Sequence, residues 1–346
     1  HSSKDKSSTF VFMAKWRKAL FPLQVIFSAG VFLRKSLYKK GVFLRYTAPV
    51  PVIVVGNIST GGTGKTPIVD YLITKFSKKY KLGILSRGYG RRSKGYVVVT
   101  PNTTATEVGD EPKMLAQKHP NVAVSVCEHR PNGLMQMLEE SPKIDAFLLD
   151  DALQHLRLKP SFKIVLTTFQ DPWFSDALLP VGNLREPTSA AQQADVVVVT
   201  KCPAILPEEI KKIYAEKLDV LPTQQLFFTT LDYDTKVRGA AEMPLEEFIK
   251  SPFILLTGIA NPSTLCAFLD EKKATYTHQS FPDHHVFTKA EIAALQKINS
   301  PILTTEKDAV RLAPYNVPNL YSLGVRVRFL GNEKNFLAAV AGAIKN

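Results

Sequence analysis

Cysteine is scarce in this chain of 346 residues, and its three cysteines, Cys127, Cys202 and Cys266, lie more than 60 residues apart. Without a CxxC pair or a Cys/His cluster, neither a disulfide framework nor a zinc site is indicated. The 18 glycines and 23 prolines are too few for a low-complexity chain, and no repeat of fixed period is present. The length and the 45% hydrophobic content therefore predict a globular protein of about two domains.

Acidic residues are almost absent from the start of the chain. Residues 1–50 hold ten Lys/Arg and a single acid, Asp5, whereas the remainder holds 34 basic and 30 acidic residues. The net charge of +13 therefore comes mainly from one end of the chain. Such an end is typical of a protein that binds nucleic acid or one that is held at an anionic membrane surface.

No apolar run near the start is long enough to cross a bilayer. Between Lys18 and Arg34 lie fifteen uncharged residues, interrupted by Pro22, against the roughly 20 that a span requires. No small-residue cleavage pattern follows them. Cations on both sides of this aromatic-rich stretch favour a helix lying in the membrane interface, and the alternative is an ordinary buried helix. The leading HSSKDKSS resembles a tag remnant, so we expect residues 1–12 to be disordered and assign 13–48 to the interfacial region.

From residue 50 the sequence alternates between short β-branched runs and helical stretches. The runs include PVIVVGN, KLGILS, YVVVT, NVAVSV, IDAFLLDD, FKIVLTTF and DVVVVTK, and PFILLTG and PILTT follow later. Continuous apolar runs separated by helices predict parallel strands buried on both faces. We predict an α/β protein with a doubly wound, mostly parallel sheet of P-loop NTPase type over residues 49–222. A smaller α/β lobe is expected over 223–346.

The segment Gly56–Pro67, GNISTGGTGKTP, is typical of a phosphate-binding P-loop because it follows a predicted strand and opens a predicted helix. Backbone amides of the loop would face the phosphates, Lys65 would reach the β- and γ-phosphates, and the Thr66 hydroxyl would bind Mg²⁺. Ser59 replaces the first glycine of the usual pattern. The predicted nucleotide-binding residues are Ser59, Thr60, Gly61, Gly62, Thr63, Gly64, Lys65 and Thr66.

Two carboxylates, Asp150 and Asp151, end the apolar run AFLLDD. P-loop enzymes hold their Mg²⁺, or a water bound to it, at such a strand end. We therefore predict Asp150 as a metal ligand. The alternative is a helix cap or a solvated loop.

Seven segments occur in an order that resembles the tetraacyldisaccharide 4'-kinase family, the lipid A kinases of Gram-negative bacteria. They are GNISTGGTGKTP, LSRGYGR (85–91), GDEP (109–112), LLDDALQH (148–155), PVGNLREP (180–187), VVTK (198–201) and FPDHH (281–285). The resemblance covers about residues 15–340 and accounts for Ser59. It implies transfer of phosphate from ATP, with Mg²⁺, to the 4'-hydroxyl of an acylated disaccharide 1-phosphate. It also implies an amino-terminal helix at the cytoplasmic face of the inner membrane.

The resemblance also implies roles for individual residues. Asp110 matches the family's proposed catalytic base, and Glu111 its acidic neighbour near the metal. The family's Asp-His motif corresponds to Asp283 and His284, with His285 as a close rival. An Asp paired with a His suits the task, because a sugar hydroxyl is a poor nucleophile until its proton is accepted. The alternatives are a solvated turn for GDEP and a capping or surface loop for FPDHH.

Arg87, Arg185 and Asp151 are candidate substrate contacts, the two arginines with phosphates of ATP or of the lipid, although either arginine could form a surface ion pair. We expect a monomer whose partners are the lipid substrate and an anionic membrane, and not nucleic acid, because the amino-terminal aromatics sit in an apolar run. A P-loop GTPase or metallochaperone is a rival interpretation. The VVTK segment resembles the start of a guanine-reading loop, but Cys202, Pro203 and Ala204 follow it where an Asp is expected.

Overall fold

The computed structural model describes residue 17 and residues 20–345. The predicted tag at 1–12 and residues 13–16 and 18–19 of the predicted interfacial region lie outside the described residues. The chain forms two compact units, each assembled from separate segments. Of the described residues, the first unit holds those up to Lys65, residues 151–230 and residues 329–345; the second holds residues 66–150 and 231–328.

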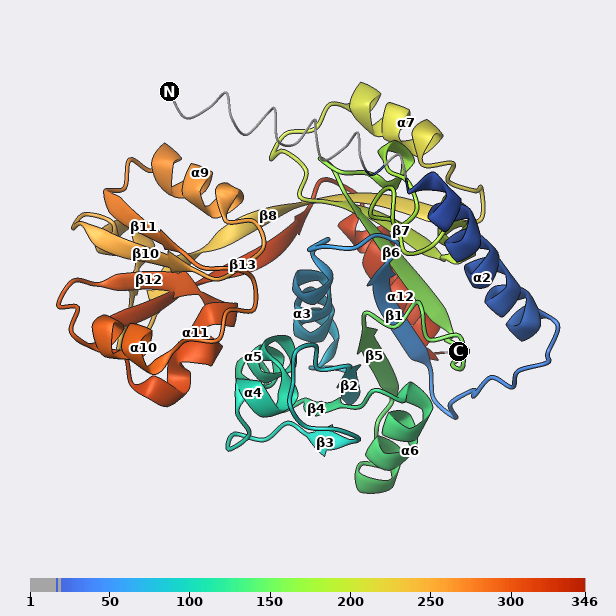
Figure 1. The fold of residues 1–346 in the computed structure, drawn as a ribbon, viewed down its shortest axis with the longest axis horizontal. Coiled ribbons are helices and arrows are strands. Elements are labelled where there is room, and N and C mark those ends of the chain that lie inside the picture. Colours follow the sequence, from blue (N-terminus) through green and yellow to red (C-terminus); the bar gives the residue numbers. More distant parts are fainter. Residues whose placement is uncertain (1–16, 18–19, 346) are drawn as a thin grey trace. The chain divides into compact units, whose positions relative to one another are not determined.

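The first unit is built on parallel strands that lie side by side in the order β8, β7, β6, β1 (Figure 1). Its elements are α2 (Phe21–Lys39), β1 (Val52–Asn57), β6 (Phe162–Thr168), β7 (Val196–Thr200), α7 (Glu208–Lys217), the start of β8 (Gln225–Arg238) and α12 (Glu333–Lys345), with short 3₁₀ helices at Trp173–Ser175 and Thr188–Gln193. Every residue of β1 and β7 is buried, as expected for parallel strands covered on both faces.

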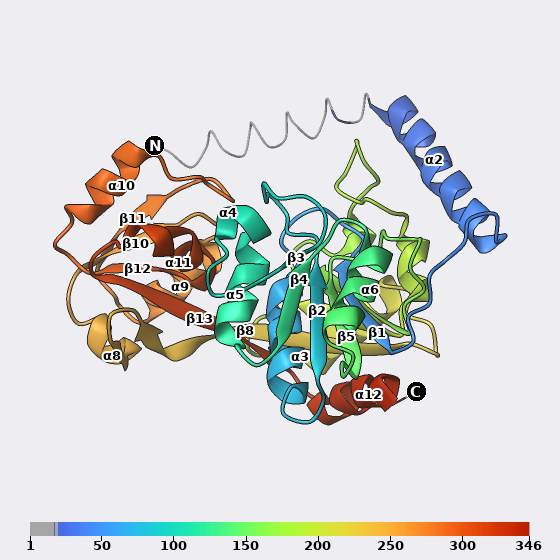
Figure 2. The same ribbon diagram turned by 90° about the horizontal axis from the view of Figure 1, so that it is seen from below.

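The second unit contains two groups of strands. The first group follows the order β5, β2, β4, β3, in which only β3 runs antiparallel (Figure 2). Its elements are α3 (Lys65–Phe76, whose first residue closes the other unit), β2 (Leu82–Ser86), β3 (Val97–Val98), α4 (Ala105–Val108), α5 (Asp110–Lys118), β4 (Ala123–Val126), α6 (Arg130–Glu140) and β5 (Ala146–Asp150).

The second group of strands in this unit is parallel and follows the order β11, β10, β12, β13. Its elements are the end of β8, β9 (Glu242–Pro244), α8 (Leu245–Phe248), β10 (Phe253–Thr257), α9 (Ser263–Glu271), β11 (Tyr276–Ser280), α10 (Lys289–Gln296), β12 (Ile302–Thr305), α11 (Glu306–Leu312), a 3₁₀ turn at Ala313–Tyr315 and β13 (Leu320–Phe329). Helix α11 packs against α5, so the two groups of strands are joined through these two helices.

The predicted fold class, an α/β protein with a doubly wound and mostly parallel sheet, is confirmed. Each β-branched run of the sequence forms a strand, and the helix after the P-loop starts where the motif places it. The long strand β8 was not predicted, because only part of it is buried and its residues form no continuous apolar run. Cys127 and Cys202 are buried, whereas Cys266 is half-buried.

Helix α2 carries apolar side chains that the protein leaves in solvent. Ile26 is 69% exposed and Phe32 is 74% exposed, and Leu44 is exposed in the segment that follows the helix. Tyr38 is the buried residue of the helix, and its ring packs against that of Phe43 in a tilted arrangement, with ring centroids 5.1 Å apart. Over the described residues, no helix combines the length and the apolar character needed to cross a membrane.

Candidate active site

The P-loop connects buried strand β1 to helix α3, in the strand–loop–helix arrangement that the motif predicts. Gly61 and Gly64 have φ angles of +103° and +83°, a region that side chains on Cβ disfavour. The loop can therefore turn its backbone amides inward ahead of the helix start. Amides at the start of a helix, together with its dipole, favour an anion such as phosphate.

Two cations share the same acceptors beside this loop. Lys65 Nζ lies 3.4 Å from Asn57 Oδ1 and 3.8 Å from Asp151 Oδ1. Arg185 donates from Nη2 to Asn57 Oδ1 (2.8 Å) and from Nε to the Ser59 carbonyl (3.0 Å), and its Nη1 lies 3.4 Å from Asp151 Oδ2. The structure thus brings together four residues singled out in the sequence, Ser59, Lys65, Asp151 and Arg185, around Asn57.

Two residues at the end of strand β7 donate hydrogen bonds to carbonyl groups of the P-loop. The Thr200 hydroxyl donates to the Thr63 carbonyl at 2.8 Å, and Lys201 Nζ donates to the Gly62 carbonyl at 2.7 Å. Burial lowers the pKa of Lys201 below its ordinary value, with Asp171 opposing that shift. These contacts fix loop carbonyls, so they help to keep the amides of the loop in place.

Oxygen ligands suited to Mg²⁺ stand at the start of α3 and the end of β5. Thr66 Oγ1 lies 3.4 Å from Asp150 Oδ2, and both side chains are buried. A hydroxyl and a carboxylate are the hard oxygen donors that Mg²⁺ takes alongside phosphate oxygens and water. The donor set therefore fits this cation. Glu111, also predicted near the metal, lies 3.6 Å from Lys307 Nζ in an ion pair between α5 and α11.

Asp110 and His284 lie in direct contact, although 174 residues separate them in the chain. Asp110 Oδ2 is 2.9 Å from His284 Nδ1, and Arg311 Nε and Nη2 donate to the same oxygen at 2.8 and 2.5 Å. Burial alone would raise the pKa of the Asp110 carboxyl, but the bonds from His284 and Arg311 hold it below its ordinary value. An ionised Asp110 requires Nδ1 of His284 to be the donor.

The other groups around His284 are charged or aromatic. Lys307 Nζ lies 3.3 Å from both His284 Nε2 and Asp283 Oδ1. The ring of Tyr89, from the LSRGYGR segment, lies 5.0 Å from the imidazole ring. His285 points elsewhere, because its Nε2 contacts Glu291 Oε2 at 3.0 Å and its ring stacks on Phe281. Of the two rival histidines, His284 is therefore the one that contacts Asp110.

The model of the tetraacyldisaccharide-1-P 4'-kinase family matches residues 16–345. A tetraacyldisaccharide 4'-kinase of Flavobacterium johnsoniae is 42% identical over 333 residues, covering 95% of this chain and 97% of its own. That of Phocaeicola vulgatus is 37% identical, covering 93% of each. The crystal structure of LpxK from Aquifex aeolicus in complex with ATP is 29% identical with a TM-score of 0.77, covering 95% of this chain and 99% of its own. This chain belongs to the tetraacyldisaccharide-1-P 4'-kinase family.

Membership in the 4'-kinase family confirms two predictions, the resemblance and the assignment of the chain as a kinase. The predicted use of ATP agrees with the nucleotide in the A. aeolicus complex. The rival interpretation as a GTPase or metallochaperone is not supported, because the family match spans nearly the whole chain.

Sequence reasoning missed several residues that the structure places in contact with the predicted ones, in one unit or the other. Asn57 carries a signal in retrospect, because it is a buried polar residue at the end of an apolar strand. Lys307 and Arg311 lie in PILTTEKDAVRL, which shows only a strand followed by a helix. Arg87, a predicted substrate contact, is exposed directly after β2.

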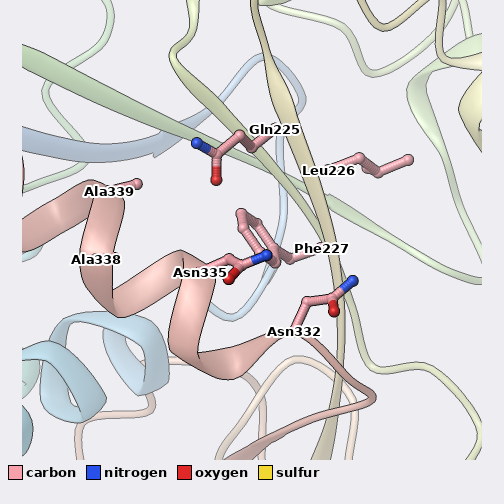
Figure 3. A pocket seen from close by; sticks show the side chains of 7 residues that line it. All are labelled: Gln225, Leu226, Phe227, Asn332, Asn335, Ala338 and Ala339. Carbon is pink, nitrogen blue, oxygen red and sulfur yellow. The ribbon is translucent and has the colours of Figure 1, made fainter.

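A cavity of about 450 Å³ lies in the first unit, between the start of β8 and helix α12 (Figure 3). It is lined by Gln225, Leu226, Phe227, Asn332, Asn335, Ala338 and Ala339. None of these residues bears a charge, and none belongs to the predicted site. The cavity therefore offers no charged side chain to a phosphate.

Proposed function

We propose that the protein transfers the γ-phosphate of ATP to the 4'-hydroxyl of a tetraacyldisaccharide 1-phosphate. The single observation that carries this proposal is the Asp110–His284 contact at 2.9 Å in a chain of this family that also has a P-loop. A proton acceptor and a phosphate-binding loop are the two parts that a kinase acting on an alcohol requires.

The P-loop is the proposed site for the ATP phosphates. Lys65, which rests on Asn57 and Asp151 in this structure, would neutralise charge that develops on the γ-phosphate. Arg185 bonds the loop itself at Ser59, so the anion that it favours is the nucleotide phosphate. The proposed metal residues are Thr66, Asp150 and Glu111, the last of which directly follows Asp110 in the sequence. A bound Mg²⁺ would neutralise further charge on the transferring group.

Asp110 is the proposed general base and His284 its partner. The lowered pKa keeps Asp110 ionised at neutral pH, so its carboxylate is ready to accept the proton of the sugar hydroxyl. His284 donates to Asp110 from Nδ1, which orients the carboxylate and shares the charge that changes during proton transfer. The two residues would then act as one unit.

The proposed lipid substrate implies work at a membrane surface. We propose that residues 13–48 bind an anionic membrane through the exposed apolar side chains of α2 and the flanking cations, at the cytoplasmic face of the bacterial inner membrane. Arg87, exposed beside the Tyr89 segment, is the proposed contact for a phosphate of the lipid. We further propose that the protein acts as a monomer.

The test is a phosphoryl-transfer assay with ATP and the disaccharide 1-phosphate in detergent micelles. Asp110→Ala should lower kcat by about 100-fold or more, with ATP affinity largely kept, since it removes an interaction made mainly in the transition state. His284→Ala should lower kcat less. The double variant should lose less than the product of the two single losses, because the two residues act as a unit.

His285→Ala is the matched control, because this neighbouring imidazole contacts Glu291 and not Asp110. Its kcat should stay close to that of the parent protein. Strict additivity of the Asp110 and His284 losses, or a larger loss from His285→Ala than from His284→Ala, would contradict the proposed pairing. Absence of any lipid phosphorylation by the parent protein would overturn the function itself.

A further inference from the structure

The two oxygens of the Asp110 carboxylate have different surroundings. Within the described part of the chain, all three side-chain hydrogen bonds to this carboxylate fall on Oδ2, from His284 Nδ1 at 2.9 Å and from Arg311 Nε and Nη2 at 2.8 and 2.5 Å. Three donors saturate the lone pairs of one carboxylate oxygen. The second oxygen, Oδ1, receives none of them.

Arg311 is itself held at its other edge. Its Nη1 donates to the Gly258 carbonyl at 2.8 Å and to Asp308 Oδ1 at 2.7 Å. The Arg311 side chain is 7% exposed and that of Asp308 is fully buried. Asp308 Oδ2 in turn accepts from the Gly258 amide at 2.9 Å and from the Thr305 hydroxyl at 2.7 Å. The guanidinium plane is therefore fixed between the loop after β10 and the carboxylate of Asp110.

Gly258 leaves room for this arrangement because it has no side chain. A Cβ at this position would lie 2.9 Å from Asp308 Oδ1 and 3.1 Å from Arg311 Nη1. Contacts as short as these require the neighbouring atoms to move. An alanine at 258 would therefore displace the guanidinium without removing any charge or donor.

We propose that Arg311 is a positioning residue for phosphoryl transfer. Together with His284 it occupies Oδ2 of Asp110, and this leaves Oδ1 to accept the proton of the acceptor hydroxyl. This inference rests on the proposed function. In the step, the hydroxyl oxygen bonds to the γ-phosphorus while the bond from that phosphorus to the β-phosphate oxygen breaks. The leaving oxygen keeps the electron pair as part of ADP, and the hydroxyl proton passes to Oδ1.

The geometry calls for arginine and not simply for a positive charge. Arg311 uses Nε and Nη2 on one edge for Asp110 and Nη1 on the other edge for Asp308 and Gly258. A planar guanidinium presents such donors in a fixed fork, whereas a lysine ammonium is a point charge on a flexible stem. A lysine at 311 keeps the positive charge but cannot bond Asp110 on one side and Asp308 and Gly258 on the other. It therefore distinguishes a positioning role from a purely electrostatic one.

The experiment measures kcat and the KM for ATP of Arg311→Met, alone and in an Asp110→Ala background, with ATP and the disaccharide 1-phosphate. In the parent background we expect kcat to fall about tenfold to 100-fold, as for a misplaced catalytic group, while the KM for ATP changes by no more than about twofold. In the Asp110→Ala background the same substitution should change kcat by less than about twofold, because the group that it positions is gone. An equal loss in both backgrounds would show a general structural role and overturn the inference.

Two further variants keep the test decisive if Arg311→Met does not fold. Arg311→Lys should lose most of the same activity, and Gly258→Ala should lower kcat in the parent background but not in the Asp110→Ala background. Full activity in both variants would overturn the proposal. The matched control is Glu306→Gln, on the same helix, which loses ion pairs to Lys118 and Arg238 and should keep kcat within about twofold. A parent protein that phosphorylates no lipid disproves the proposed function instead.

Discussion

Lys118 on α5 forms ion pairs with α3 and α11 in the second unit. Its burial and its partners set how far its removal should lower the free energy of local unfolding. Its Nζ lies 2.8 Å from Asp70 Oδ2 on α3 and 3.1 Å from Glu306 Oε2 on α11. Burial alone would raise the pKa of Asp70, but His119 and Lys118 lower it below its ordinary value. Lys118→Met therefore leaves two carboxylates without this ammonium, and one of them, Asp70, is buried.

The expected loss lies between two limits. Exposed ion pairs contribute up to about 1 kcal/mol, whereas breaking a fully buried pair costs about 3–5 kcal/mol. The side chains of Lys118 and Asp70 are 23% and 11% exposed, and His119 still contacts Asp70. We therefore expect Lys118→Met to lower the free energy of local unfolding by about 2 kcal/mol, or about 30-fold in the opening equilibrium.

Hydrogen exchange followed by mass spectrometry is the suitable assay, because it reports α3 and α5 separately. Lys272→Met is the control, since its partner Glu246 is 69% exposed, against 11% for Asp70, and the pair should contribute less than about 1 kcal/mol. The loss of protection from exchange in α3 should also depend on pH. Because the pKa of Asp70 is lowered on folding, its contribution is present above its unfolded value of 3.8 and is lost as pH falls through the folded value.

Two results would refute this reasoning. One is a loss in α3 protection no larger than that of Lys272→Met. The other is a loss that stays the same when Asp70→Asn is added to Lys118→Met, because the double variant no longer buries a charge without its cation and should recover part of the stability.

Two other predictions concern the nucleotide and the membrane. Lys65→Ala should lower kcat by at least about 100-fold at saturating ATP, since it removes the cation next to Asn57 and Asp151; near-normal turnover would contradict the role given to the P-loop. Ile26→Glu should weaken binding to anionic vesicles in a sedimentation assay and raise the KM for lipid more than that for ATP. Ile205→Glu, at an apolar position that is still more exposed (87% against 69% for Ile26), is its control, and equal vesicle binding by both variants would contradict the role of α2.

The features that the sequence determined are local ones. The P-loop was predictable because its strand, its loop and the helix start are contiguous, so short-range chemistry places Lys65 and Thr66. The buried parallel strands were predictable because each is a continuous β-branched run. The order of the motifs was likewise enough to identify the family, because the motifs are spread along almost the whole chain.

Tertiary structure alone decided which distant side chains meet. Asp110 contacts His284 and not His285, since the carboxylate of Glu291 on α10 takes the second imidazole. Arg311 reaches Asp110 across 201 residues only because α11 packs against α5. No local pattern encodes that packing, because a charged residue on a helix face looks the same in sequence whether it meets solvent or a carboxylate. The partner is set by how the two helices dock, and that depends on the whole core beneath them.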